Sequence, residues 1–230
     1  MGTLYIVGTP IGNLEDISLR ALRTLKEADF ILCEDTRVTK KLLVHYQIDK
    51  PLISYHQHSD AKKASEILEL LRVGKNLAFV TDAGTPGISD PGSDLVAEVV
   101  RQMPDAKIVP IPGPSALAAI ASIAGFPMDK FVFLGFPPAK KGRKKFFEAV
   151  AQAEHTAIFY ESPYRIIKSL EELKTLAGQA KNYKLKTVVG RELTKKFETI
   201  YRGTIGEVLD QLRVGETRGE FVVVVGKTRS

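Results

Sequence analysis

Carboxylates directly follow two apolar runs of the sequence. Glu34 and Asp35 come after one run, and Asp82 comes after another. A carboxylate at the end of a buried strand can accept a hydrogen bond from a ligand amine or hydroxyl, or take a proton from a reacting group. Asp82 could instead cap a helix, but Gly84 and Pro86 delay any helix there. The sequence therefore favours a ligand-facing role for Asp82.

Three Gly/Pro turns must hold such groups in place, and each follows a short apolar run. They lie in LYIVGTPIGN (4–13), NLAFVTDAGTPGISDPG (76–92) and KIVPIPGPSA (107–116). Glycines let the backbone approach a ligand closely, and prolines hold a loop in one conformation. Strands of a parallel sheet that end in such turns place the turns at one edge, where open α/β folds bind ligands. The pattern predicts a small-molecule site.

Strand and helix patterns alternate along the whole chain. Apolar runs without strict alternation predict buried parallel strands at 4–7, 29–33, 77–81 and 107–111, with helices at 18–27, 36–46, 61–71 and 91–102. After a Pro-Gly-Pro interruption we expect strands at 131–134, 156–160, 186–190, 197–203 and 220–226, and helices at 116–124, 143–153, 163–177 and 204–212. Polar and apolar residues alternate at 198–202, which favours antiparallel pairing. We predict two α/β domains, 1–112 with a mostly parallel sheet and 113–230 with a mixed sheet.

Composition excludes several classes of protein. The single cysteine, Cys33, excludes a disulfide framework and a multi-cysteine zinc site, and its apolar neighbours favour a buried, inert thiol. No G-x-G-x-x-G occurs, which argues against a dinucleotide-binding domain, and the four histidines lack H-E-x-x-H spacing. We therefore expect no metal site. No apolar run approaches membrane-spanning length, so we expect a cytoplasmic protein without membrane contact.

A basic run follows Pro137-Pro138 and leads into a predicted helix. The net charge of +6 suits a polyanionic partner, although a merely solvated basic surface is an equal alternative from charge alone. Five cations within six positions favour phosphate binding over a solvated surface. The aromatic residues that follow, Phe146 and Phe147, are expected in the core. The predicted RNA-binding residues are Lys140, Lys141, Arg143, Lys144 and Lys145.

Longer motifs occur in a fixed order along the chain, and the family resemblance that they carry extends from about residue 3 to 227. They are LYIVGTPIGNLEDISLRAL, EDTR, VTDAGTPGISDPG, PGPSA, PAKKGR, FYESPYR and GRELTKKFE. Together they resemble the ribosomal RNA small-subunit methyltransferase I family of the tetrapyrrole-methylase superfamily. The resemblance implies a homodimer of two-domain chains with S-adenosylmethionine in the cleft between the domains. The cofactor-binding residues that it implies are Pro10, Asp82, Thr85, Ser115, Ala116, Tyr160, Leu193 and Thr194.

The activity that this resemblance implies is methylation of the ribose 2′-hydroxyl of a cytidine, cytidine-1402, in the 16S rRNA of the 30S subunit. Methyl transfer from a sulfonium is an in-line displacement, so positioning supplies much of the rate and a nearby base or cation assists. The sequence leaves the catalytic group open among Glu34, Asp35, Glu161, Arg191, Glu192 and Lys195.

Two other functions remain as alternatives. The superfamily scaffold also suits a C-methyltransferase acting on a tetrapyrrole precursor, although the basic run and the EDTR and YESPYR segments favour RNA. A non-catalytic RNA-binding module is the third reading, and it fits poorly because all the implied cofactor loops are intact.

Overall fold

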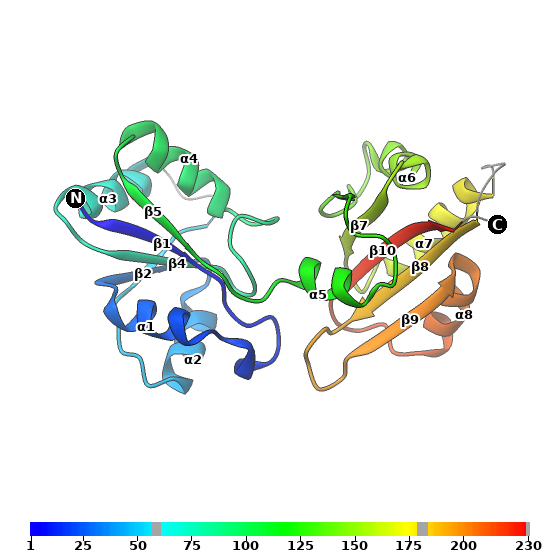
Figure 1. Cartoon of the computed structure of the whole chain (residues 1–230), viewed down its shortest axis with the longest axis horizontal. Coiled ribbons are helices and arrows are strands. Elements are labelled where there is room, and N and C mark those ends of the chain that lie inside the picture. Colours follow the sequence, from blue (N-terminus) through cyan, green and yellow to red (C-terminus); the bar gives the residue numbers. More distant parts are fainter. Residues whose placement is uncertain (57–60, 179–183, 229–230) are drawn as a thin grey trace. The chain divides into compact units, whose positions relative to one another are not determined.

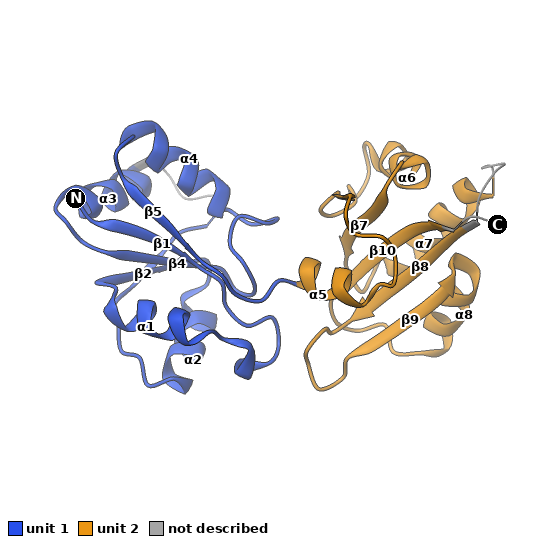
Figure 2. Cartoon of the chain, in the orientation of Figure 1, with its two compact units in different colours: residues 1–115 blue, residues 116–230 orange. Residues whose placement is uncertain are grey.

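The computed structural model describes residues 1–56, 61–178 and 184–228. The chain divides into two compact units, residues 1–115 and 116–230, which Figure 2 shows in different colours. Each unit has its own sheet and its own apolar core. The division falls within the PGPSA segment, close to the boundary expected after residue 112.

The first unit is a parallel sheet with helices on both faces. Its strand order is β3-β2-β4-β1-β5, and every neighbouring pair is parallel. Figure 1 shows α3 and α4 on one face of the sheet and α1 and α2 on the other. The elements are β1 (Thr3–Val7), η1 (Leu14–Asp16), α1 (Leu19–Glu27), β2 (Phe30–Cys33), α2 (Thr36–His45), β3 (Leu52–Ser54), α3 (Ala61–Arg72), β4 (Leu77–Val80), α4 (Gly92–Gln102) and β5 (Lys107–Ile111).

Alternation along β4 explains why its sequence is continuously apolar. Leu77 and Phe79 pack in the core that contains residues of α3 and α4, whereas Ala78 and Val80 pack in the core that contains residues of α1 and α2. Successive side chains of a strand point to opposite faces, so a strand covered on both faces needs apolar residues at every position. Both faces of β4 are therefore buried.

The second unit is a mixed sheet of order β6-β7-β10-β8-β9. Only the β6–β7 pair is parallel among these strands as described, and the other three pairs are antiparallel. The side chains of α6, α7 and α8 share one core with the sheet, and α5 contacts β10. The elements are α5 (Ala116–Ile123), β6 (Phe131–Phe133), α6 (Arg143–Gln152), β7 (Thr156–Glu161), α7 (Ile166–Ala177), β8 (Lys184–Arg191), β9 (Thr199–Thr204), α8 (Ile205–Val214) and β10 (Phe221–Thr228).

The predicted architecture is confirmed, with differences in detail. Each predicted strand and helix is present within a few residues of its predicted bounds. The edge strand β3 (Leu52–Ser54) was not predicted, because its three residues are too few to give a periodic pattern. The expected antiparallel pairing occurs through β8, which lies between β9 and β10 and pairs with both.

Candidate functional site

The turns after β1, β4 and β5 lie against one another at the carboxyl edge of the first sheet. Thr9 and Gly84 exchange two backbone hydrogen bonds of 2.9 and 3.1 Å, and the Gly8 N–H donates to the Ile111 carbonyl at 3.0 Å. The Thr85 hydroxyl donates to the Pro114 carbonyl at 3.0 Å. Three turns far apart in the sequence therefore form one loop cluster, defined here by residues 8–13, 81–91 and 112–115.

Glycine is required where two of these turns meet. A Cβ on Gly8 would lie 2.8 Å from the Cα of Gly113, and a Cβ on Gly113 would lie 2.7 Å from the Gly8 carbonyl oxygen. Real Cβ atoms do not approach backbone so closely, because contact distances between carbon atoms are about 3.5–4.0 Å. The close approach of these two turns therefore depends on the absence of side chains at both positions.

Asp82 and Asp35 are linked at the ends of β4 and β2. The Asp35 N–H donates to the exposed Asp82 carboxylate at 3.1 Å, and Asp35 itself caps α2 by accepting from the Arg37 N–H at 2.8 Å. The Arg37 guanidinium lies 2.6 Å from the Asp35 carboxylate and holds the pKa of Asp35 at about 2. Asp35 is therefore a charged helix cap, and both of its oxygens are already engaged by Arg37.

Glu34 differs from Asp35 because its carboxylate accepts no hydrogen bond within the described chain. Its side chain is half-buried, and burial raises its pKa, with further increases from the charges of Asp82 and Asp90 that outweigh a lowering by His56. Burial also raises the pKa of Asp82. Asp90 is used structurally, because its carboxylate accepts from the backbone N–H groups of Gly87 and Gly92 and fixes the turn before α4.

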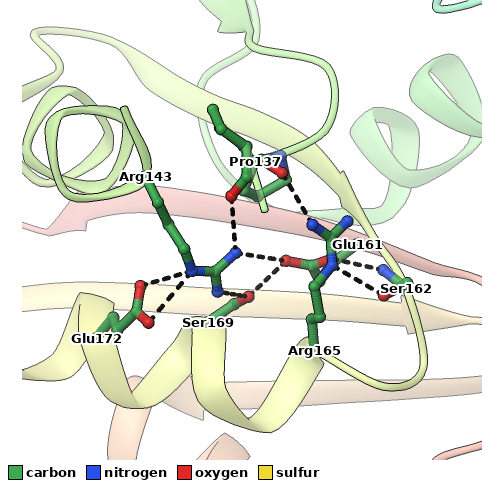
Figure 3. Close-up of polar contacts among 8 residues, drawn as sticks. Pro137, Arg143, Glu161, Ser162, Arg165, Ser169 and Glu172 are labelled. Atoms are coloured by element: carbon green, nitrogen blue, oxygen red, sulfur yellow. Dashed lines mark hydrogen bonds and ion pairs between the residues drawn. The ribbon is translucent and has the colours of Figure 1, made fainter. Parts of the chain in front are cut away.

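A buried ion network surrounds Glu161 at the end of β7 (Figure 3). The Glu161 side chain is 0% exposed, and one of its oxygens lies 3.0 Å from the Arg165 Nε and 2.7 Å from the Ser162 N–H. The other oxygen accepts from the Ser169 hydroxyl at 2.5 Å and lies 3.8 Å from an Arg143 nitrogen. Both oxygens of this candidate catalytic residue thus face donors of the protein itself, so we do not retain Glu161 as a base.

Arg143 belongs to the same network and is buried. Its guanidinium lies 2.9 Å from Glu172, donates to the Ser169 hydroxyl at 2.7 Å and to the Pro138 carbonyl at 3.3 Å. It also lies over the Phe147 ring, 5.0 Å from the centroid. A buried guanidinium that is bound to these partners cannot also neutralise an RNA phosphate. The prediction that Arg143 binds RNA is therefore wrong. It anchors the basic run instead.

The four lysines of the basic run are exposed, as a phosphate-binding surface requires. Lys140 and Lys141 precede α6, which begins at Arg143, and Gly142 adopts a φ of +89° at the junction. Lys144 lies 3.8 Å from Glu148, an exposed pair that contributes little to stability. No carboxylate of the described chain lies within ion-pair distance of Lys140, Lys141 or Lys145.

The segment after β8 is a tight loop held by its own charged side chains. Arg191 is buried and donates to the carbonyls of Phe197 at 3.0 Å and Arg218 at 2.7 Å. Lys195 lies 2.9 Å from the carboxylates of both Glu192 and Glu220. Burial opposes the charge on Glu192, but hydrogen bonds from the Glu220 N–H and Lys195 outweigh it, so the pKa of Glu192 is lowered. These three catalytic candidates are engaged in holding the loop.

The remaining predicted cofactor residues lie at turns of both units. Pro10 is buried in the loop cluster, and Ser115 and Ala116 are half-buried at the start of α5. The Tyr160 ring contacts Phe133 and Phe136 at centroid distances of 4.9 and 5.3 Å. Leu193 is buried and Thr194 is half-buried in the loop after β8, where Thr194 has a φ of +65°.

Sequence reasoning missed Ser169 and Glu172, which complete the network around Arg143 and Glu161. A signal was available, because Arg165, Ser169 and Glu172 recur at spacings of four and three and so share one face of α7. Within the described residues, no cluster of three or more histidine, cysteine or acidic side chains could hold a metal ion. None of the described helices is long and apolar enough to span a membrane.

Comparisons with known proteins agree with the observed fold. Residues 3–209 match the model of the tetrapyrrole (corrin/porphyrin) methylases. The structure of diphthine synthase superimposes with a TM-score of 0.73 at 17% identity, covering 100% of this chain and 92% of that chain. Uroporphyrin-III C-methyl transferase from Thermus thermophilus, complexed with S-adenyl homocysteine, superimposes with a TM-score of 0.63 at 19% identity, covering 97% of each chain.

Sequence relatives are much closer. Ribosomal RNA small subunit methyltransferase I of Thermotoga maritima is 43% identical, with 98% of each chain aligned. The Bacillus subtilis protein of the same name is 45% identical over 98% of this chain and 75% of that protein. The fold and the family model define the chain as a tetrapyrrole methylase, and its sequence relatives show that it belongs, within that class, to the ribosomal RNA small subunit methyltransferase I family.

Proposed function

We propose that this protein is an S-adenosylmethionine-dependent enzyme that methylates the ribose 2′-hydroxyl of cytidine-1402 in 16S rRNA. The observation that carries the proposal is identity of 43–45% over 98% of this chain to relatives named for rRNA methylation. The exposed lysines of the basic run support an RNA substrate. The proposed substrate is 16S rRNA, either free or within the 30S subunit. Because this substrate is cytoplasmic, we propose that the enzyme acts in the cytoplasm.

The loop cluster fits the proposed cofactor. Asp82 is an exposed carboxylate followed by Ala83 and Gly84, whose small size leaves room for a ligand beside it. Such a carboxylate accepts hydrogen bonds from ligand amine or hydroxyl groups. The other residues proposed to contact the cofactor are Pro10, Thr85, Ser115, Ala116, Tyr160, Leu193 and Thr194. When bound, the cofactor supplies an electrophilic methyl group on a sulfonium.

We propose Glu34 as the group that accepts the proton of the ribose hydroxyl. Of the six candidates, Asp35, Glu161, Glu192 and Lys195 are held in ion pairs, and Arg191 is bound to two carbonyls. The Glu34 carboxylate carries no such partner in the described chain, and its raised pKa brings it nearer to the working range of a general base. Glu34 therefore remains after the others are assigned to structure.

The experiment that tests the activity offers labelled S-adenosylmethionine and the protein to three acceptors: 30S subunits, naked 16S rRNA and a porphyrinogen. Label in the ribose of cytidine-1402 supports the proposal, and label in the porphyrinogen supports the alternative C-methyltransferase. Label in no acceptor, with cofactor binding absent by calorimetry, supports a non-catalytic RNA-binding module.

The role of Glu34 has its own test. Glu34→Gln should lower kcat about 100-fold or more, because a positioned general base contributes that much. The wild-type rate should fall in acid as Glu34 becomes protonated, and this acid limb should be absent from the variant. A variant that retains the acid limb would show that another group accepts the proton.

The proposed enzyme is a homodimer, as the family resemblance suggests. Sedimentation at micromolar concentration measures the assembly directly, and a single species of 25.3 kDa would contradict it.

A further inference from the structure

Two aromatic side chains stand exposed on neighbouring turns of the second unit. Tyr164 is 95% exposed and Phe136 is 52% exposed. The aromatic residues that the sequence places beside the basic run are not available, because Phe147 is fully buried and Phe146 packs against the same core. Phe131 in β6 and Phe197 in the loop after β8 are also exposed, but Phe136 and Tyr164 are the exposed rings on the turns after β6 and β7.

Hydrogen bonds join these two turns and fix their positions. The Arg165 guanidinium donates to the Pro137 carbonyl at 3.1 Å and to the Ser162 hydroxyl at 3.1 Å (Figure 3). The Tyr160 N–H donates to the Gly135 carbonyl at 2.9 Å. Because buried Glu161 in turn holds Arg165, the two turns that carry the rings are fixed, and binding a ligand orders little additional backbone.

The surroundings of the two rings identify the kind of partner. The exposed Lys140 and Lys141 follow Phe136 within five positions, and no described carboxylate lies within ion-pair distance of them. The Phe136 ring contacts the ring of Tyr160, one of the proposed cofactor contacts, at a centroid distance of 5.3 Å. Rings beside a row of cations are the arrangement that binds single-stranded nucleic acid, in which bases stack while cations follow the phosphates.

We propose that Tyr164 and Phe136 form a stacking platform for unpaired bases of the RNA substrate. This inference rests on the proposed function, because it assumes an RNA substrate, and it adds that the substrate is held as a single strand. The platform would hold bases that flank the target nucleotide, while Lys140 and Lys141 neutralise the phosphates between them. An apolar protein partner would be a poor match for this cationic border.

Binding of a short RNA tests the platform. The probe is a single strand of about 12 nucleotides that contains 2-aminopurine, compared with the same strand annealed to its complement. Tyr164→Ala and Phe136→Ala should each weaken single-strand binding about 5- to 150-fold and reduce the fluorescence quenching that stacking causes. Tyr164→Phe keeps the ring and should bind like wild type. Val214→Ala, at a residue 90% exposed on α8, is the matched control and should also bind like wild type.

Salt dependence separates stacking from charge. The slope of log affinity against log salt should stay at the wild-type value in Tyr164→Ala and become shallower in Lys140→Ala/Lys141→Ala, because only the lysines release counterions. Wild-type affinity for the single strand in both aromatic variants, or an equal loss for the duplex, would overturn the platform. Methylation of 30S subunits by the wild-type protein is measured alongside. Its absence would refute the proposed function, whereas methylation with unaltered RNA binding by the variants would refute the platform alone.

Discussion

The Glu161 network provides the most direct test of the physical reasoning, through the substitution Glu161→Gln. The side chain of Glu161 is 0% exposed, and those of Arg143 and Arg165 are 9% and 30% exposed. A glutamine has nearly the same volume, so the change removes charge without opening a cavity. One carboxylate oxygen faces the Ser162 N–H and the Arg165 Nε, and the other faces the Ser169 hydroxyl. The new NH₂ group must therefore face either the Ser162 N–H and the Arg165 Nε, which are donors, or the Ser169 hydroxyl, which already accepts from Arg143.

The expected loss follows from removing the buried carboxylate that faces the Arg165 guanidinium, whereas Arg143 keeps its closer partner Glu172 at 2.9 Å. Breaking a buried ion pair by removing one partner costs about 3–5 kcal/mol, which is roughly a 100- to 4,000-fold change in the unfolding equilibrium. Glu171→Gln is the matched control, because Glu171 lies on the same helix, α7, and pairs with Arg213 at 2.7 Å on the surface. That exposed pair should contribute no more than about 1 kcal/mol.

Hydrogen exchange measured by mass spectrometry is the appropriate assay, because the two units have separate cores and need not unfold together. Amides of β7 and α7 should lose protection in Glu161→Gln, while amides of β4 in the first unit should exchange at the wild-type rate. If β7 and α7 exchange within about 5-fold of wild type, the pair contributes less than 1 kcal/mol and the reasoning is wrong.

Three further variants test other parts of the site. Replacing Lys140, Lys141 and Lys145 with alanine should make the salt dependence of RNA binding shallower by about 0.7 per lost contact, equally for target and non-target RNA, in filter-binding titrations. Asp82→Asn should raise the melting temperature at neutral pH, because burial raises the pKa of Asp82 and disfavours its charge; the gain should shrink in acid, where wild-type Asp82 is protonated. Gly8→Ala should separate two turns of the loop cluster and weaken cofactor binding, measured by calorimetry.

The sequence predicted well those parts of the fold that depend on local pattern. Continuous apolar runs identified strands such as β4 and β10 because a strand buried on both faces has no polar position. Strand order across the sheets was not predictable in the same way. In the structure, β8 lies between β9 and β10, and β1 lies between β4 and β5. These positions depend on packing between segments that are distant in the sequence, and local periodicity carries no information about such packing.

In the candidate site too, features that depend on consecutive residues were predictable, and features that depend on tertiary contacts were not. The Gly/Pro turns indicated where Asp82 and Thr85 would lie, because a strand and its turn are consecutive in sequence. The burial of Arg143 was not evident, since its neighbours in sequence are exposed lysines and its partners Ser169 and Glu172 are 26 and 29 residues away. Counting charges does not distinguish among the five cations of the basic run, whereas in the structure Arg143 is buried and anchors the run.

The Arg143 anchor connects the proposed RNA-binding surface with the proposed cofactor contact Tyr160, which the sequence analysis treated separately. Through Glu161, Ser169 and Arg165, the network joins the end of β7, the turn that carries Tyr164 and the start of the basic run. Weakening it should therefore impair RNA binding and the positioning of Tyr160 together, whereas removing surface lysines should impair RNA binding alone. Arg143→Lys separates these cases, because lysine keeps the charge but lacks the planar fork that reaches Glu172, Ser169 and Pro138 at once. If this variant loses RNA affinity although the positive charge is kept, Arg143 acts by holding the loop; wild-type affinity would show that a positive charge alone is enough, as expected for a phosphate contact.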